Sequence, residues 1–266
     1  MVNQASSAWK FACLGVVLTG LLFGVCTAPA HAAAPTASGK AFDFSIQISV
    51  AGINVLNQAP VDQVQFTDMS APYNNVMQTG SFDSGPGLAR LQTGSLVAET
   101  EWIPTNSFLA VGSRATANDV NLSVVDVTAV SLLSLQANQI QSTSIVTGTC
   151  PPSIMQLLVA NIVDDYIFRN GFEVVNLLPS STAKLPGLGI TVLGTSLASL
   201  PTDPPPNTSI TLPVGESLVL NEQVVSGDGI TSLSVTSNAL HLVLNMAGII
   251  TSDIIIAPSE ASIACH

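Results

Sequence analysis

Apolar and polar residues alternate along several stretches of this chain, most regularly from Phe42 to Val50. Five apolar residues occupy every second position there, and polar or charged residues stand between them. A period of two puts one side of a β-strand in a core and the other in water, whereas a helix would scatter these apolar residues around its axis. We therefore predict a half-buried strand at this position.

Further β-type segments follow along most of the chain. They are Leu91–Thr100, Ser107–Ala117, Asn121–Cys150, Ser209–Val214, Glu216–Val225 and the closing stretch to Cys265. In Asn121–Cys150, Ser and Thr stand between the apolar residues, as suits the outer face of an exported sheet. Pro60–Pro86 mixes Pro, Asn, Gly and Ser and reads as loops with short strands. The pattern predicts a mainly β, antiparallel β-sandwich-like fold.

One stretch, residues 153–168, favours a helix. Ile154, Leu157, Leu158 and Ile162 share a face at spacings of three and four. Ser153 fits a helix cap, and Asn170-Gly171 fits a stop. We predict one short helix there, although several β-branched residues would also suit a strand.

Two segments resemble each other. Leu122–Cys150 and Leu233–Cys265 both open with Leu-Ser-Val, continue with β-type residues and end in Cys. This similarity predicts a single domain over residues 33–266 with two similar halves, 40–150 and 185–265, and an insertion at 151–184. Three consecutive prolines within Thr202–Asn207 favour an extended connector, which is either a linker between two parts or an exposed loop within one domain.

Residues 1–32 are typical of a secretory signal peptide. Lys10 precedes the apolar stretch Phe11–Val25, which is short for a membrane span, and Ala30-His31-Ala32 fits the pattern that signal peptidase reads. We expect cleavage after Ala32. Two alternatives are a lipid-modified Cys26, which Val25 disfavours, and a retained membrane anchor.

After cleavage two cysteines remain, Cys150 and Cys265. Both fall in phase with apolar residues of their segments, so we expect both to face the core. Two cysteines in an exported chain most simply pair with each other, and the alternative is two buried free thiols. Their spacing excludes a C-x-x-C redox motif.

The charge of the chain limits its partners. The formal net charge is −11, charged residues make up only 9%, and 47% of residues are hydrophobic. Such a chain can bury a sizeable core, and its acidity disfavours binding to nucleic acid or anionic lipid. Beyond the signal peptide no stretch approaches the length of a membrane span. We expect a secreted or extracytoplasmic protein, whose partners are other envelope or extracellular components.

Candidate catalytic and metal-binding residues are few. His241 would have to serve any Ser-His-Asp set, yet it stands between Leu240 and Leu242 as an ordinary strand histidine would. Glu99 and Glu101 share one face of a strand and are the candidate glycosidase pair. The densest group of oxygen ligands, better explained as a solvated helix end than as a weak calcium site, is Asp164, Asp165, Asn170 and Glu173. We predict no catalytic, metal or cofactor site.

Several runs resemble the choice-of-anchor P family of exported bacterial proteins. They are Pro206–Pro213, Leu218–Gln223, Asn238–Leu242, Asp253–Ala257 and Ala261–Cys265, with Gly94-Ser95-Leu96 in the first half. The resemblance implies an exported protein without an established activity. In addition, Tyr166–Glu173 resembles the I-F-x-x-G-F-E tail of many exported proteins of Gram-negative bacteria, although here it is internal.

These observations predict an exported, non-enzymatic β-rich protein of the bacterial envelope or exterior with a structural or adhesive role. One alternative is a glycan or small-molecule binding module that uses loops such as Pro60–Pro86. The other is a secreted hydrolase that uses Glu99 and Glu101, or His241.

Overall fold

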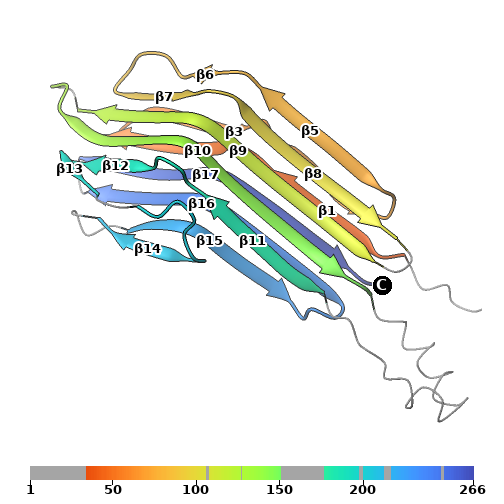
Figure 1. Ribbon diagram of the computed structural model, residues 1–266. Helices are drawn as coiled ribbons and strands as arrows, with labels where there is room; N and C mark the ends of the chain where they lie inside the picture. Colours follow the sequence, from red (N-terminus) through yellow and green to blue (C-terminus); the bar gives the residue numbers. More distant parts are fainter. Residues whose placement is uncertain are drawn as a thin grey trace, which may run out of the picture. The chain divides into compact units, whose positions relative to one another are not determined.

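The structure, a computed structural model, describes residues 34–105, 108–126, 128–150, 177–197, 200–212, 217–246 and 249–266. Every regular element within these ranges is a β-strand, and the strands form two antiparallel sheets that pack against each other (Figure 1). The predicted sandwich-like fold is thus confirmed. The predicted helix at 153–168 lies outside the described residues.

The first sheet combines strands from both ends of the chain. Its eight strands are β1 (Thr36–Ala41), β2 (Phe44–Val50), β3 (Ile53–Val61), β4 (Val64–Met69), β14 (Thr208–Thr211), β15 (Ser217–Gly227), β16 (Ser232–Met246) and β17 (Ile250–Ala264). The long strand β17 pairs with β16 on one side, and with β1 and β2 in succession on the other. The first strand of the domain therefore lies beside the last.

The second sheet is built from the middle of the chain. Its nine strands are β5 (Tyr73–Thr79), β6 (Phe82–Asp83), β7 (Ala89–Thr93), β8 (Leu96–Pro104), β9 (Leu109–Val125), β10 (Ser131–Gly148), β11 (Leu178–Lys184), β12 (Gly189–Val192) and β13 (Thr195–Ser196). The hairpin of β9 and β10 forms its centre, with β7 and β8 along one side and β11 and β12 along the other.

The two sheets do not follow the expected halves 40–150 and 185–265. Strands β1 to β4 from the first stretch share a sheet with β14 to β17 from the second. The two hairpins that end in cysteine, β9–β10 and β16–β17, do occupy similar central places in their sheets. The duplication itself stays a prediction.

Pro60–Pro86 contains more strand than its composition indicates. Strands β4, β5 and β6 lie within it, and the end of β3 reaches it. Almost every residue of the edge strand β5 is exposed, so this strand has no buried face to maintain. Alternation is weak where neither face is buried, and for this reason the sequence predicted only loops with short strands here.

Both sheets are crossed by a line of strand irregularities. In the eight-stranded sheet the line runs through Asn221, Ala239, Ala257, Asp43 and Asp62, which are neighbours on successive strands. Asn221, Ala257 and Asp62 have φ near +50°, a left-handed conformation that is typical of β-bulges. On β16 and β17 the burial pattern changes phase at this line, so the buried residues of each strand do not follow a single period of two.

The nine-stranded sheet has a matching line. Gly94 donates its backbone N–H to the carbonyl of Asn118, and Asn138 donates to that of Pro186. Asp119 and Gly187 have positive φ at this level. A Cβ at Gly187 would lie 2.6 Å from the side-chain nitrogen of Asn138, so glycine is required there by both conformation and space.

Small hydroxyl residues divide the interior into two apolar clusters. The larger cluster includes Phe44, Ile46, Leu122 and Leu240, and the smaller one surrounds Trp102 near the end of β10. Between them every inward-facing position is small, in a layer that comprises Gly39, Thr100, Ser113, Ser142, Ser144, Ser237 and Ser259. We call this set the hydroxyl layer. Its Ser142 and Ser144 are fully buried, contrary to the expectation that Ser in this segment lies outside.

The sheets approach each other closely at the hydroxyl layer. A Cβ at Gly39 would lie 2.6 Å from Cε1 of Phe66 and 3.0 Å from Oγ of Ser113. Ser142 Oγ donates to Ser259 Oγ at 2.7 Å, and Ser144 Oγ donates to the Ser259 carbonyl at 3.0 Å. These hydrogen bonds connect β10 in one sheet with β17 in the other.

The Ser259→Ala substitution should lower the free energy of unfolding by about 1–2 kcal/mol, because it leaves the buried Ser142 hydroxyl without its partner. Ser237→Ala is the matched control, since the Ser237 hydroxyl is buried in the same layer and has no hydrogen-bond partner among the described residues. We expect the control to be neutral or slightly stabilising in urea unfolding. Equal losses in both variants would contradict a bonding role for Ser259.

A disulfide joins the ends of the two sheets. Cys150 follows β10 and Cys265 follows β17, and their Cα atoms lie 5.4 Å apart in a bonded pair that is 115 residues apart in sequence. Both cysteines pack against the smaller apolar cluster, although neither is fully buried. The predicted pairing is confirmed, and the bond links the two sheets.

One carboxyl group is fully buried between the sheets. Asp43 lies at the break between β1 and β2, and neither of its carboxyl oxygens has a partner that satisfies hydrogen-bond geometry. Burial raises the pKa of Asp43 to about 8, and the nearby Asp62 carboxylate also raises it, while the backbone N–H groups of Thr116 and Val97 lower it. The folded protein therefore keeps Asp43 protonated at neutral pH.

The proline segment at Thr202–Asn207 is part of the domain. Pro204 is buried, and its carbonyl accepts a 2.8 Å hydrogen bond from the side chain of the buried Asn221. Asn207 in turn accepts a hydrogen bond from the backbone N–H of Gln223. The segment is thus a loop attached to the eight-stranded sheet, and not a linker between domains.

Candidate functional site

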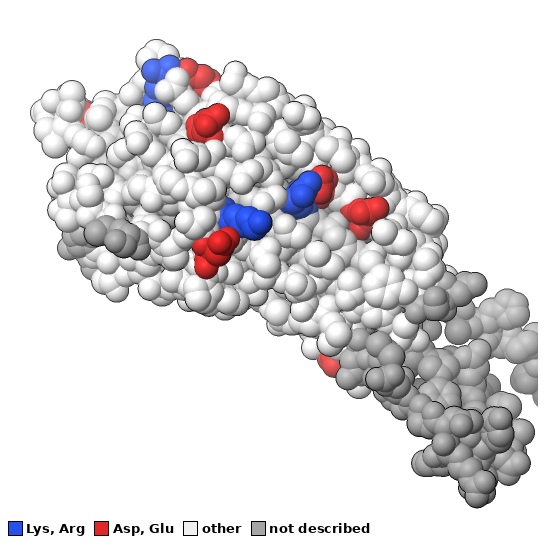
Figure 2. Space-filling model, in the orientation of Figure 1, with Lys and Arg blue, Asp and Glu red and all other residues white. Residues whose placement is uncertain are grey.

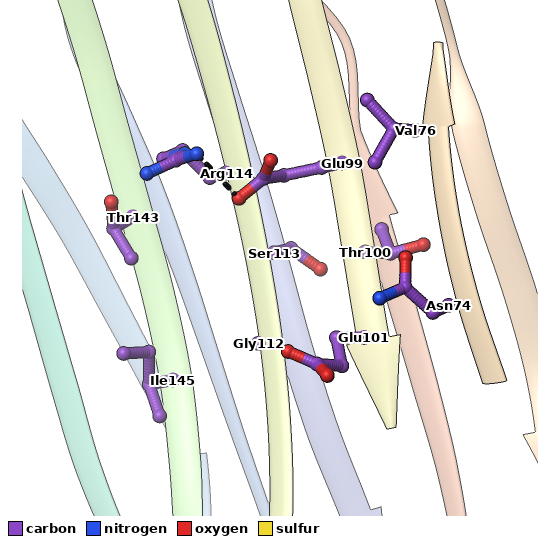
Figure 3. A pocket seen from close by; sticks show the side chains of 10 residues that line it. All are labelled: Asn74, Val76, Glu99, Thr100, Glu101, Gly112, Ser113, Arg114, Thr143 and Ile145. Carbon is purple, nitrogen blue, oxygen red and sulfur yellow. Dashed lines mark ion pairs between the residues drawn. The ribbon is translucent and has the colours of Figure 1, made fainter. Parts of the chain in front are cut away.

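The outer face of the nine-stranded sheet carries a hollow of about 310 Å³. Strands β5, β8, β9 and β10 supply its lining residues, which are Asn74, Val76, Glu99, Thr100, Glu101, Gly112, Ser113, Arg114, Thr143 and Ile145 (Figure 3). We call it the Gly112 hollow. It lies on regular strands, so the sheet register fixes the positions of its walls.

The hollow exists because one row of the sheet lacks a side chain. The register places Asn74 opposite Glu101, Glu101 opposite Gly112, and Gly112 opposite Ile145. A Cβ built on Gly112 would meet only Cγ1 of Ile145, at 3.9 Å. Glycine thus leaves open space in the middle of the row, between the Glu101 and Ile145 side chains.

The neighbouring row supplies an ion pair. Arg114 Nη2 lies 2.8 Å from Glu99 Oε1. The Arg114 side chain is 45% exposed, and the Glu99 side chain is 32% exposed. The register places these two residues directly opposite each other. Glu101, by contrast, makes no ion pair or side-chain hydrogen bond with the rest of the described chain. The hollow therefore has a fixed guanidinium on one side and a free carboxylate on the other.

Glu99 and Glu101 share one strand face, as predicted. Two residues apart on one strand, their Cα atoms are about 7 Å apart and their side chains stand side by side. Glycosidase carboxyl groups flank the bond that they cleave, whereas these two rise from the same strand and one is bound by Arg114. The ion pair with Arg114 thus distinguishes Glu99 from Glu101.

His241 lies on the outer face of the eight-stranded sheet between two carboxylates. Its Nδ1 is 2.9 Å from Glu222 Oε2, and its Nε2 is 3.2 Å from Asp253 Oδ1. Asn238 also donates to the same Glu222 oxygen, at 2.7 Å. Both ring nitrogens thus face acceptors, which leaves neither in position to take a proton from a serine hydroxyl. The half-buried His241 matches the strand histidine expected from the sequence.

Metal ligands do not converge in the part of the chain that the structure describes. No group of three or more His, Cys, Asp and Glu side chains is arranged there to hold an ion. The two carboxylates at His241 lie at opposite ring nitrogens, so the three side chains cannot reach one point. The weak calcium candidates Asp164, Asp165, Asn170 and Glu173 lie outside the described residues.

A second, smaller hollow of about 210 Å³ lies on the outer face of the eight-stranded sheet. Serine residues of four strands line part of it, among them Ser38, Ser226, Ser234 and Ser262. The Ser38 hydroxyl already accepts the backbone N–H of Asp68, and the Ser262 hydroxyl donates to the Ser38 carbonyl. Because local partners use these groups, this hollow is the weaker candidate.

The sequence pattern indicates two of the residues in the Gly112 hollow, Glu99 and Glu101. It missed Arg114 and Gly112, which come from the next strand and enter the site only through its register. It also placed a binding site on the Pro60–Pro86 loops, but only Asn74 and Val76 of that stretch line the hollow, and both belong to strand β5.

Comparison with known proteins gives no relative: no family model, no curated protein and no solved structure matches this chain. Within the residues that the structure describes, there is also no helix with the length and apolar character needed to cross a bilayer.

Proposed function

We propose that this chain is an exported, non-enzymatic protein of the bacterial envelope or exterior, with a structural or adhesive role. The Cys150–Cys265 disulfide carries the proposal, because such bonds persist in oxidising compartments outside the cytoplasm. The signal-peptide pattern at residues 1–32 and the resemblance to choice-of-anchor P proteins support the same location and class.

The outer surface agrees with a structural or adhesive role. The face of the nine-stranded sheet carries only scattered charged side chains (Figure 2). Hydroxyl and amide groups such as Ser123, Gln136, Gln141 and Thr143 project from β9 and β10 instead. Such a surface presents many neutral hydrogen-bonding groups, and the net charge of −11 disfavours nucleic acid as a partner.

The non-enzymatic part of the proposal rests on the two sets of candidate catalytic residues. Glu99 is bound by Arg114 and stands beside Glu101 on one strand, and His241 faces carboxylates at both nitrogens. Neither set places a nucleophile and a base within reach of each other. A hydrolase is therefore the least supported of the three functions.

A glycan or small-molecule binding module is the second candidate. The Gly112 hollow favours it, since it is an open depression with both polar and apolar walls, and these walls are held by four neighbouring strands. Binding of this kind is also how an adhesive protein would attach to a surface, so the two candidates share one site.

Export can be tested with the full chain in a Gram-negative bacterial host. We expect the protein outside the cytoplasm, beginning at Ala33, and non-reducing digestion followed by mass spectrometry should find the Cys150 and Cys265 peptides joined. In the native bacterium, deletion of the protein should weaken cell attachment or the integrity of the envelope. A full-length cytoplasmic product with both thiols free to alkylate would defeat the proposal.

A further inference from the structure

We propose that the Gly112 hollow binds one sugar unit of a neutral saccharide. This inference rests on the adhesive function proposed above and names the ligand class of that function. It is drawn from the charges, the apolar contacts and the size of the hollow.

The polar groups of the walls favour a ligand with many hydroxyl groups. Glu99 and Arg114 neutralise each other in their ion pair, and the remaining carboxylate of Glu101 would repel an anion. Sugar hydroxyls both donate and accept hydrogen bonds. The hollow offers carboxylate acceptors, guanidinium donors, the Asn74 amide and the Thr143 hydroxyl within one depression, which matches such a ligand.

Two apolar side chains complete the surface that a sugar needs. Val76 is 53% exposed on β5, and the half-buried Ile145 faces the hollow from β10. They lie at opposite sides of the hollow, because β8 and β9 separate their strands. The C–H groups of a sugar ring can pack against either side chain while its hydroxyls reach Glu101 and Asn74.

The binding groups are held in place before a ligand arrives. The ion pair at 2.8 Å limits the motion of Arg114 and Glu99, and all walls stand on strands rather than loops. Preorganisation of this kind lowers the cost of ordering side chains on binding. The hollow, at about 310 Å³, is at the lower end of ligand-site volumes, which limits it to a small ligand or one unit of a chain.

The test is to fill the hollow without disturbing the sheet. Gly112→Val adds a side chain to the open space above Gly112, where only Ile145 approaches, and valine suits a strand. Gly189→Val is the matched control: Gly189 is an exposed strand glycine on β12 with no atom within 4 Å of an added Cβ. Both variants should unfold at or above the wild-type temperature.

Binding is measured on the full exported chain by nuclear magnetic resonance titration. The probes are neutral oligosaccharides of glucose, mannose, galactose and N-acetylglucosamine, with oligogalacturonate and pentalysine as charged comparisons. We expect a neutral sugar to shift amide signals around Gly112 and Glu101. Gly112→Val should weaken this binding at least about tenfold, whereas Gly189→Val should not.

Three results would overturn the inference. They are no response to any neutral sugar, a stronger response at the hollow to either charged probe, and sugar binding that Gly112→Val leaves intact.

Failure of the proposed function can be distinguished from failure of the saccharide inference. If the sugar binds at the hollow but Gly112→Val cells attach normally, the site stands and its adhesive use fails. If cells need the protein for attachment but no sugar binds, the adhesive function stands and the saccharide inference fails.

Discussion

Removal of the disulfide by the Cys150→Ala, Cys265→Ala double substitution should lower the free energy of unfolding by about 4–5 kcal/mol. The bond closes a loop with a sequence separation of 115, and in the chain-entropy model a loop of this length restricts the unfolded chain strongly. For a domain of this size the melting temperature should fall by roughly 10–15 °C. Calorimetry of the purified exported chain measures both quantities.

A reducing agent supplies the control for this result. It should bring the wild-type protein close to the double variant and should leave the double variant unchanged. The Ser259→Ala variant should respond to reduction like the wild type, since Ser259 and the disulfide act at different places. If the double variant has the same melting temperature as the wild type, this bond does not stabilise the protein by restricting its unfolded chain.

Asp43→Asn should make the protein more stable at alkaline pH and remove part of its pH dependence. The unfolded chain releases this proton near pH 3.8, whereas the folded protein keeps it to about pH 8. Between these pH values the folded state binds more protons than the unfolded state. The contribution of protonated Asp43 to the free energy of unfolding is therefore fully present below pH 3.8 and is lost as the pH rises to 8. Across that window the variant should gain on the order of 6 kcal/mol relative to the wild type.

Urea unfolding at several pH values measures this gain, and Asp228→Asn provides a control of opposite sign. Asp228 is exposed, and the hydroxyl of Thr231 and the backbone N–H groups of Ser232 and Ile230 hold its pKa well below the usual range. Its contribution is present above the unfolded pKa and is lost on acidification. An Asp43→Asn variant with the wild-type pH slope above pH 3.8 would contradict a protonated, buried Asp43.

The strand at Phe42–Val50 shows how much of the fold the alternation could predict. Phe44, Ile46, Ile48 and Val50 are buried on one face of β2, as expected. The pattern did not reveal the break at Asp43, because a polar residue in an outward position is what an unbroken strand would also show. The buried carboxyl there follows from neighbours on other strands, which only the structure supplies.

The hydroxyl layer was hidden for a related reason. Ser142, Ser144 and Ser259 occupy inward positions, but Ser is usually an outer-face residue, so the Ser residues of Asn121–Cys150 read as solvent-facing. Their burial depends on the close approach of the sheets at Gly39. A contact between two sheets leaves no periodic signal in either strand.

The site was found only in part. Glu99 and Glu101 are two apart on one strand, so their common face follows from the period of two alone. Arg114 and Gly112 reach them through the β8–β9 register, in which Glu99 lies opposite Arg114 and Glu101 opposite Gly112. Register depends on turns and packing, and the single sequence did not specify it.

The pairing of the first strand with the last determines how the domain would respond to mechanical force. Thr36 lies opposite Ala264, and the ladder runs inward from there to Ala41 opposite Ser259. A pull that separates Thr36 from Ala264 would load these hydrogen bonds one after another, which is the weak, unzipping direction. At Cys265, however, the disulfide transfers the load to Cys150 and so to β10 of the other sheet. Strand β1 should therefore peel away first, while the sheets stay clamped at this end.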